Sequence, residues 1–221
     1  MKILILAAMD KEINLLLNLL TSIEEKDKEG LIWWEGNINS HNIYIAKCGI
    51  GKVNSAINAF RLIQTIKPDL VINSGVAGGA GLPIGSVLVA DKVAYHDVWC
   101  GPGTEYGQAD GQPLFMIPSD GIIKITDKEN LTKGLICSGD KFISSSDEIK
   151  FIRSVFPDVK AVDMESASIA QTCGLCGVPF AIIRVVSDTP GEGENVSQYK
   201  DFWTTAPQRT FSVLNVILKN L

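Results

Sequence analysis

Apolar and polar positions alternate along the chain in blocks that predict strands and helices in turn. A continuous apolar run at 2–7 predicts a buried strand, and the helical spacing of Leu and Ile over 10–20 predicts a helix. Near-continuous apolar strands that alternate with helices indicate an α/β fold with a covered sheet. We expect further strands at 31–36, 42–48, 69–74, 86–91, 134–138, 159–163 and 179–187, and further helices at 52–66, 146–154, 165–173 and 198–219.

The strand expected at 69–74 runs into a glycine-rich segment at 75–79. We expect a tight turn there, in which the backbone approaches a ligand or a neighbouring strand. The glycine spacing fits neither a dinucleotide fingerprint nor a P-loop. A long polar loop is expected over 96–113. Since no repeat or linker interrupts the pattern, the sequence predicts a single domain over 1–221.

Composition narrows the class of protein. The chain is 46% hydrophobic and 20% charged, which excludes intrinsic disorder. Its net charge of −5 argues against a nucleic-acid groove. The first apolar run is too short to span a bilayer, so no membrane association is expected. Five irregularly spaced cysteines predict neither a disulfide framework nor a metal site, and they favour a reducing cytoplasm. No cofactor is expected.

Polar residues cluster where apolar strands end, in segments 8–12, 73–79, 162–166 and 184–188. Three of these segments bring a carboxylate to the end of a strand, namely Glu12, Glu165 and Asp188. Taken singly, each is explained as an acid at a helix N-terminus, which the helix dipole favours. Taken together beside a glycine-rich segment, they favour one shared acid/base cleft.

Eight collinear fragments resemble the 5′-methylthioadenosine/S-adenosylhomocysteine nucleosidases of the nucleoside phosphorylase and hydrolase superfamily. The resemblance implies a mixed, partly barrel-like sheet flanked by helices, and a homodimer. The fragments are Ala8-Met9-x-x-Glu12, Gly49-Ile50-Gly51-Lys52-Val53, Asn73-Ser74-Gly75-x-Ala77-Gly78-Gly79, Tyr95-His96-Asp97, Glu105-Tyr106-Gly107-Gln108, Ser138-Gly139-Asp140-x-Phe142-Ile143, Met164-Glu165 and Arg184-x-x-Ser187-Asp188.

The resemblance implies hydrolysis of the N-glycosidic bond of 5′-substituted adenosines, with release of adenine. Asp188 matches the acid that donates a proton toward adenine N7, for which burial must raise its pKa. Glu12 matches the base that holds and activates water. Glu165 matches the carboxylate that accepts hydrogen bonds from the ribose hydroxyls, and Arg184 is expected to help hold the water.

The resemblance also assigns the binding residues. Phe142 would stack on adenine while the backbone of Ile143 reads its edge, and Ser187 would orient Asp188. Met164 would line the ribose. The apolar 5′ end of the substrate would be lined by Met9, Ile50 and Tyr199.

Two alternatives stay open. The first is a phosphate-dependent phosphorylase, which is disfavoured because Glu12 would repel phosphate and no arginine follows the strand at 69–74. The second is a catalytically silent nucleoside-binding relative, which is disfavoured because all three carboxylates are present. The chain departs from many relatives at Val76, where they carry Ser, and in the loop 98–104, which contains Trp99. The aromatic character of the 96–113 loop predicts that it closes the site of a neighbouring subunit.

Overall fold

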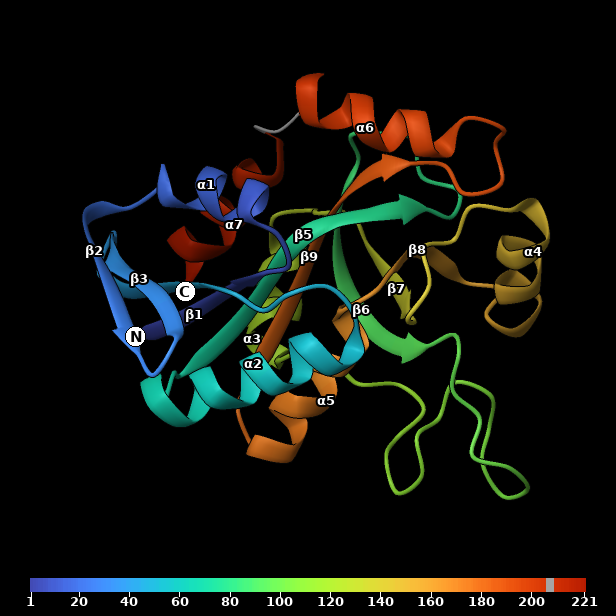
Figure 1. The fold of residues 1–221 in the computed structure, drawn as a ribbon, viewed down its shortest axis with the longest axis horizontal. Coiled ribbons are helices and arrows are strands. Elements are labelled where there is room, and N and C mark those ends of the chain that lie inside the picture. Colours follow the sequence, from blue (N-terminus) through green and yellow to red (C-terminus); the bar gives the residue numbers. More distant parts are fainter. Residues whose placement is uncertain (206–208) are drawn as a thin grey trace.

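The computed structural model describes residues 1–205 and 209–221, and one mixed sheet runs through this part of the chain (Figure 1). Its strands are β1 (Lys2–Ala7), β2 (Thr21–Lys28), β3 (Leu31–Ile38), β4 (His41–Lys47), β5 (Leu70–Gly79), β6 (Val87–Tyr95), β7 (Lys133–Ser138), β8 (Val159–Asp163) and β9 (Phe180–Asp188). The helices are α1 (Asp10–Leu17), α2 (Lys52–Ile66), α3 (Asp120–Lys128), α4 (Ser146–Val155), α5 (Ser166–Cys176), α6 (Asn195–Thr205) and α7 (Arg209–Asn220).

The sheet combines an open part with a barrel. Its strand order is β2-β3-β4-β1-β5-β8-β7-β6-β9, and β5 also pairs with β9, so the strands from β5 to β9 close on themselves. The pairings of β1 with β4 and β5, and of β5 with β9, are parallel, whereas β5 pairs with β8 in the antiparallel sense. The mixed, partly barrel-like α/β fold expected from the sequence is confirmed.

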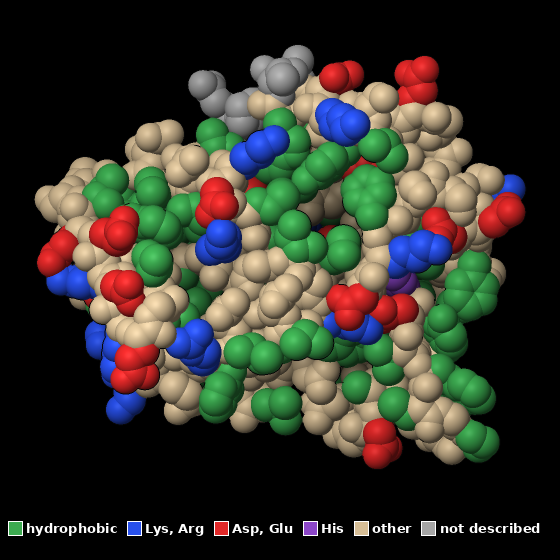
Figure 2. Space-filling view, viewed as in Figure 1, with side chains coloured by type: hydrophobic (Ala, Val, Ile, Leu, Met, Phe, Trp, Pro, Cys, Tyr) green, Lys and Arg blue, Asp and Glu red, His purple; other side chains and the backbone are tan. Residues whose placement is uncertain are grey.

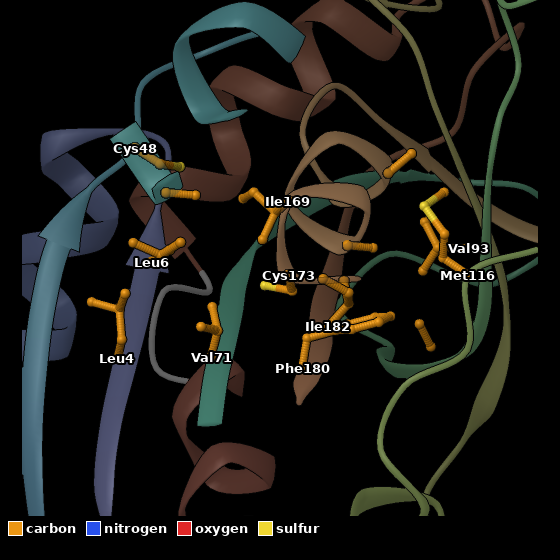
Figure 3. Close-up of a cluster of buried hydrophobic side chains, with 14 of the residues drawn as sticks. Leu4, Leu6, Cys48, Val71, Val93, Met116, Ile169, Cys173, Phe180 and Ile182 are labelled. Atoms are coloured by element: carbon orange, nitrogen blue, oxygen red, sulfur yellow. The ribbon is translucent and has the colours of Figure 1, made fainter. Parts of the chain in front are cut away.

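Helices cover both faces of the open sheet, which explains why its central strands are apolar throughout. Side chains alternate along β1, so Leu4 and Leu6 belong to a buried layer that also contains residues of α2 and α5, while Ile3 and Ile5 belong to a second layer with residues of α1, α3 and α7. Figure 3 shows the first of these layers, where Ile169 of α5 points toward β1 and β5. Burying a large apolar side chain stabilises the folded protein by roughly 1.5–3 kcal/mol. The many buried side chains of the two layers therefore hold the strands, and with them the strand ends, in place.

β5 corrects the expectation of a tight turn at 75–79, because the strand continues to Gly79. The glycines serve close packing instead. A Cβ on Gly78 would lie 2.6 Å from Cγ of Pro190, and a Cβ on Gly79 would lie 2.6 Å from the Leu82 carbonyl oxygen. The predicted close approach of the backbone is present, but without the turn.

Three further elements differ from expectation. β2 was not expected, because this edge strand is mostly exposed and its residues are largely charged or polar. α3 was also missed, since it buries only a narrow face. The single helix expected at 198–219 is two helices, α6 and α7, and residues 206–208 of that expectation lie outside the described residues. The sequence has a proline, a helix-breaking residue, at position 207.

Residues 96–113 contain no helix or strand, as expected, and the segment extends away from the sheet beyond β6 (Figure 1). None of the helices in the described ranges has the length and apolar character needed to cross a membrane.

Candidate active site

The carboxyl ends of four strands, β1, β5, β8 and β9, meet around one cavity of about 160 Å³. β1, β5 and β9 are parallel and end in the same direction, and ligand sites in such sheets form beyond these carboxyl ends. Figure 2 shows a hollow at this position, rimmed by hydrophobic side chains. The cavity is lined by Ala8, Met9, Glu12, Ile50, Val76, Ala77, Gly78, Phe142, Val162, Asp163, Met164, Glu165, Ser187, Asp188 and Tyr199.

Glu12 is buried in the first turn of α1, and backbone donors hold its carboxylate. Oε2 accepts hydrogen bonds from the N–H groups of Ala8 and Met9 at 2.9 and 3.0 Å, and Oε1 accepts one from Val76 at 3.2 Å. Burial raises the pKa of Glu12, and these donors oppose that rise. A Cβ on Gly75 would lie 2.8 Å from Oε1, so only glycine leaves room for this carboxylate.

Arg184 lies behind the wall of the cavity rather than on its surface. Its side chain is buried, Nε donates to Oδ2 of Asp163 at 2.8 Å, and Nη1 donates to the carbonyls of Asn73 and Ile183 at 3.2 and 3.0 Å. Nη2 donates to Oδ1 of Asn73. Its positive charge lowers the pKa of Glu12, in opposition to burial. Arg184 therefore offsets the negative charge of the cavity through the wall.

Glu165 caps the N-terminus of α5, two residues after β8 ends at Asp163. Its side chain is buried, and Oε1 accepts the backbone N–H of Gly51 at 3.0 Å. Burial raises the pKa of Glu165 to about 7, and the negative charges of Asp163 and Glu12 act in the same direction. This carboxyl therefore exchanges its proton near neutral pH.

A β-bulge near the end of β9 brings two successive side chains to the cavity. Ala77 of β5 pairs with Val186 and Gly78 pairs with Asp188, so Ser187 is an extra residue in β9. Side chains normally alternate between the faces of a strand, and a bulge redirects them. Both Ser187 and Asp188 line the cavity as a result.

Asp188 is only 2% exposed, and neutral donors surround it. Oδ1 accepts the Ser187 hydroxyl at 2.7 Å, and Oδ2 accepts the Asn195 side-chain amide at 3.2 Å. Burial raises the pKa of Asp188, and both donors oppose the rise. Unlike Glu12, whose pKa is also lowered by an arginine charge, Asp188 has only uncharged donors to oppose burial. Its environment is suited to a carboxyl that stays protonated.

Apolar and aromatic side chains form the opposite part of the cavity. The rings of Phe142 and Tyr199 meet edge to face at 5.7 Å, and the Tyr199 hydroxyl donates to Sδ of Met9 at 3.4 Å. Ile50 lies at the rim, with 49% of it exposed. A second cavity of about 30 Å³ shares Phe142 and Asp188 with the first and is also lined by Ile143.

The structure brings the site residues expected from the sequence together, since all of them except Arg184 and Ile143 line the main cavity. Sequence reasoning missed Asp163 and Asn195. Asp163 had a signal, because it ends a strand directly before Met164 and Glu165. Asn195 had none. In the described ranges, no group of three or more His, Cys, Asp or Glu side chains is arranged to hold a metal ion.

Comparison with known proteins assigns the family. The family model described as the phosphorylase superfamily matches residues 2–219. The 5′-methylthioadenosine/S-adenosylhomocysteine nucleosidase of an Exiguobacterium species is 40% identical over 232 residues, a match that covers 100% of this chain and 99% of that protein. This chain belongs to that nucleosidase family. It is therefore an enzyme of the N-glycosyl hydrolase class.

Solved structures agree with this family. The methylthioadenosine/S-adenosylhomocysteine nucleosidase of S. pneumoniae, solved with the transition-state inhibitor MT-ImmA, superimposes with a TM-score of 0.94 at 36% identity, covering 100% of this chain and 99% of that one. A futalosine hydrolase mutant of Helicobacter pylori superimposes with a TM-score of 0.90 at 30% identity, covering 100% and 99%. The same fold thus occurs in a protein named for a different substrate.

Proposed function

We propose that this protein hydrolyses the N-glycosidic bond of 5′-substituted adenosines and releases adenine. The substrates are 5′-methylthioadenosine and S-adenosylhomocysteine, and 5′-deoxyadenosine is a further candidate. The observation that carries this proposal is the meeting of three buried carboxyls, Glu12, Glu165 and Asp188, across one cavity with an aromatic and apolar end. Their surroundings differ enough to support three separate roles.

Asp188 acts as the general acid in this proposal. Adenine leaves poorly as an anion, so a proton delivered to N7 while the bond breaks lowers the barrier. The burial of Asp188 and the absence of a charged donor in its hydrogen bonds keep the neutral acid available. Phe142 stacks on the base, and the backbone of Ile143 hydrogen-bonds its edge.

Glu12 acts as the base that activates water. Burial raises the pKa of its carboxylate, and the Arg184 charge and three backbone donors oppose that rise, in favour of the ionised form that a base requires. Glu165 accepts hydrogen bonds from the ribose hydroxyls, and its negative charge stabilises a ribosyl cation. An acid and a water-holding base on opposite sides of the sugar resemble the inverting glycosidase arrangement.

Water is the nucleophile in this proposal, rather than phosphate. No Lys or Arg side chain is among the described residues that line the main cavity, whereas the ionised carboxylates among them repel a dianion. A phosphorylase would need cations at this position.

We also propose that the enzyme is a cytoplasmic homodimer. On α2, Val53, Ile57 and Phe60 share one helix face at spacings of four and three residues, and they are 66%, 54% and 52% exposed. Figure 2 shows hydrophobic side chains along this part of the surface. Trp99, in the 96–113 loop, is 60% exposed. A single subunit leaves this apolar surface in water, and a second copy would cover it.

The cytoplasmic location is supported by the cysteines. All five are unpaired, as expected in a reducing compartment.

A substrate panel tests the activity. Adenine release is measured from 5′-methylthioadenosine, S-adenosylhomocysteine, 5′-deoxyadenosine and aminodeoxyfutalosine, with and without inorganic phosphate. We expect free sugar as product and rates that do not depend on phosphate. Formation of a ribose 1-phosphate would contradict the proposal and support a phosphorylase, and binding without turnover would support a silent relative.

The role of Asp188 is tested by Asp188→Asn, which keeps the size of the side chain but cannot transfer a proton. We expect near-normal substrate binding and a kcat at least ~100-fold lower, the lower limit for general acid catalysis. A ribosyl 4-nitrophenyl substrate, whose leaving group departs as an anion, should partly restore Asp188→Asn. Glu12→Gln should stay slow on both substrates. Near-normal turnover of 5′-methylthioadenosine by Asp188→Asn would show that Asp188 is not the acid.

A further inference from the structure

Asn195, the first residue of α6, connects the two groups that face the base in the proposed function. Its side chain is only 4% exposed. Nδ2 donates a hydrogen bond to the Ile143 carbonyl at 3.1 Å and a second one to Oδ2 of Asp188 at 3.2 Å. One amide group therefore joins the carboxyl to the backbone of a segment about 50 residues away in sequence.

The backbone partner fixes the orientation of this amide. The Ile143 carbonyl can only accept a hydrogen bond, so the NH₂ group of Asn195, and not its oxygen, must face it. The same NH₂ group then points its second hydrogen at Asp188, whatever the protonation state of the carboxyl. From the other side, the Ser187 hydroxyl donates to Oδ1, so the Asp188 carboxyl is held at both oxygens.

We propose that Asn195 is a positioning residue for Asp188, holding the carboxyl in a fixed orientation relative to the Ile143 backbone. This inference rests on the proposed function, in which Asp188 protonates the base and Ile143 reads its edge. Asn195 lines neither the main cavity nor the second, smaller one. It therefore acts through Asp188 and does not touch the substrate.

The position of Asn195 on α6 links the acid to the apolar end of the site. Tyr199 lies four residues later, on the same helix face, and lines the cavity. The position of α6 therefore determines both the orientation of Asp188 and the place of Tyr199 in the cavity. Gln198 of the same helix attaches α6 to the backbone after β9, since its Oε1 accepts the backbone N–H of Thr189 at 2.9 Å. Gln198 provides a matched control, because it anchors α6 without contacting Asp188.

The hydrogen bond from Asn195 stabilises the charged form of Asp188, so its loss raises the pKa of Asp188 further. The acid must be protonated for turnover, and the fall in kcat/KM toward high pH therefore moves to higher pH when Asn195 is replaced. The other titratable groups that line the two cavities with Asp188 are Glu12, Lys141, Asp163, Glu165 and Tyr199. None of these is changed by the substitution.

The test compares Asn195→Ala, Asn195→Asp and Gln198→Ala on 5′-methylthioadenosine and on the ribosyl 4-nitrophenyl substrate. For Asn195→Ala we expect kcat on 5′-methylthioadenosine to fall about tenfold, a part of the ~10²–10⁴-fold that a general acid supplies, with little change on the nitrophenyl substrate. The fall in kcat/KM toward high pH should also move to higher pH. Asn195→Asp keeps the shape of the side chain but replaces the donor by an acceptor, and it should lose at least as much. Gln198→Ala should leave the ratio of the two rates and the pH limb unchanged.

A double variant separates this inference from the proposed function. If Asn195 acts through Asp188, adding Asn195→Ala to Asp188→Asn causes no further loss. Equal losses on both substrates, or an unmoved pH limb, would overturn the inference and leave Asn195 with a packing role in α6. If Asp188→Asn itself slows both substrates equally, the acid assignment fails and the inference fails with it.

Discussion

Three of the carboxyls that line the main cavity, those of Glu12, Glu165 and Asp188, lie in different surroundings. Glu12 has three backbone N–H donors and the nearby charge of Arg184. Glu165 has a single backbone donor and two negatively charged neighbours, Asp163 and Glu12, whose effect on its pKa the Arg184 charge opposes. Asp188 has two neutral donors. Pairs of titratable groups whose surroundings differ in this way carry different roles in acid/base catalysis.

Glu165 should lower the stability of the folded protein at neutral and higher pH. Its pKa is raised from the ordinary 4.5 to about 7, so the folded protein binds the proton more tightly than the unfolded chain. Its contribution to stability is fully present below pH 4.5 and is lost as the pH rises through about 7. Glu165→Gln retains an oxygen that can accept the Gly51 N–H. We expect it to raise the free energy of unfolding at about pH 8 by up to ~3 kcal/mol, from 1.36 kcal/mol per pKa unit.

Urea unfolding at about pH 8 and about pH 4 measures this effect. The gain should shrink toward zero at the lower pH, where the native carboxyl is already neutral, while turnover is impaired at both. A Glu165→Gln variant that is less stable than the native chain at about pH 8 would contradict the prediction.

At the scale of elements, α4 supports the segment that carries Phe142 and Ile143. Its N-terminus is closed by a capping box, in which the Glu148 N–H donates to Oγ of Ser145 at 3.3 Å and the Ser145 N–H donates to Oε2 of Glu148 at 3.1 Å. The same helix end also contacts the loop that follows Asp188, because a Cβ on Gly191 would lie 2.8 Å from Cα of Ser146. α4 therefore holds two cavity segments from outside.

Ser145→Ala should lower the free energy of unfolding by about 1 kcal/mol, because it removes the side-chain cap of α4. We expect kcat to be almost unchanged, since the site side chains remain. Ser154→Ala is the matched control in the same helix. Ser154 is exposed and donates only to the Phe151 carbonyl, so its loss should be nearly neutral. Chemical denaturation compares the two, and equal losses would argue against the capping contribution.

At the scale of the whole molecule, the exposed face of α2 is the surface that the proposed dimer should cover. Replacing Ile57 by Glu places a charge in the middle of this face, and burial of an unpaired charge is unfavourable. We expect Ile57→Glu to be monomeric at micromolar concentration and to lose activity, because the 96–113 loop would no longer close a neighbour's site. Ile23→Glu is the control, since Ile23 is 50% exposed on the edge strand β2.

Sedimentation velocity and adenine release, measured on the same samples, decide this prediction. The native chain and Ile23→Glu should both be dimeric and active. A native chain that is monomeric and fully active at micromolar concentration would contradict both the dimer and the role of the loop.

The sequence by itself determined the elements whose signal is local. Apolar runs identified the central strands β1, β5 and β9, and helical spacing identified α2 and α4. The signal was weak where burial is weak, so the charged edge strand β2 and the short helix α3 were missed. The resemblance of the collinear fragments to a known family also indicated most of the side chains that line the cavity.

Only the tertiary structure decided how those side chains meet. The Gly51–Glu165 hydrogen bond spans 114 residues, and it depends on the packing of distant elements. The bulge at Ser187 depends on the register between β5 and β9, and the place of Arg184 behind the cavity depends on Asn73 and Asp163. Asn195 reaches Asp188 because α6 docks over the strand ends. The physical reason is that propensity and periodicity act over a few residues, whereas the site is made by pairing and packing between segments that are far apart in the chain.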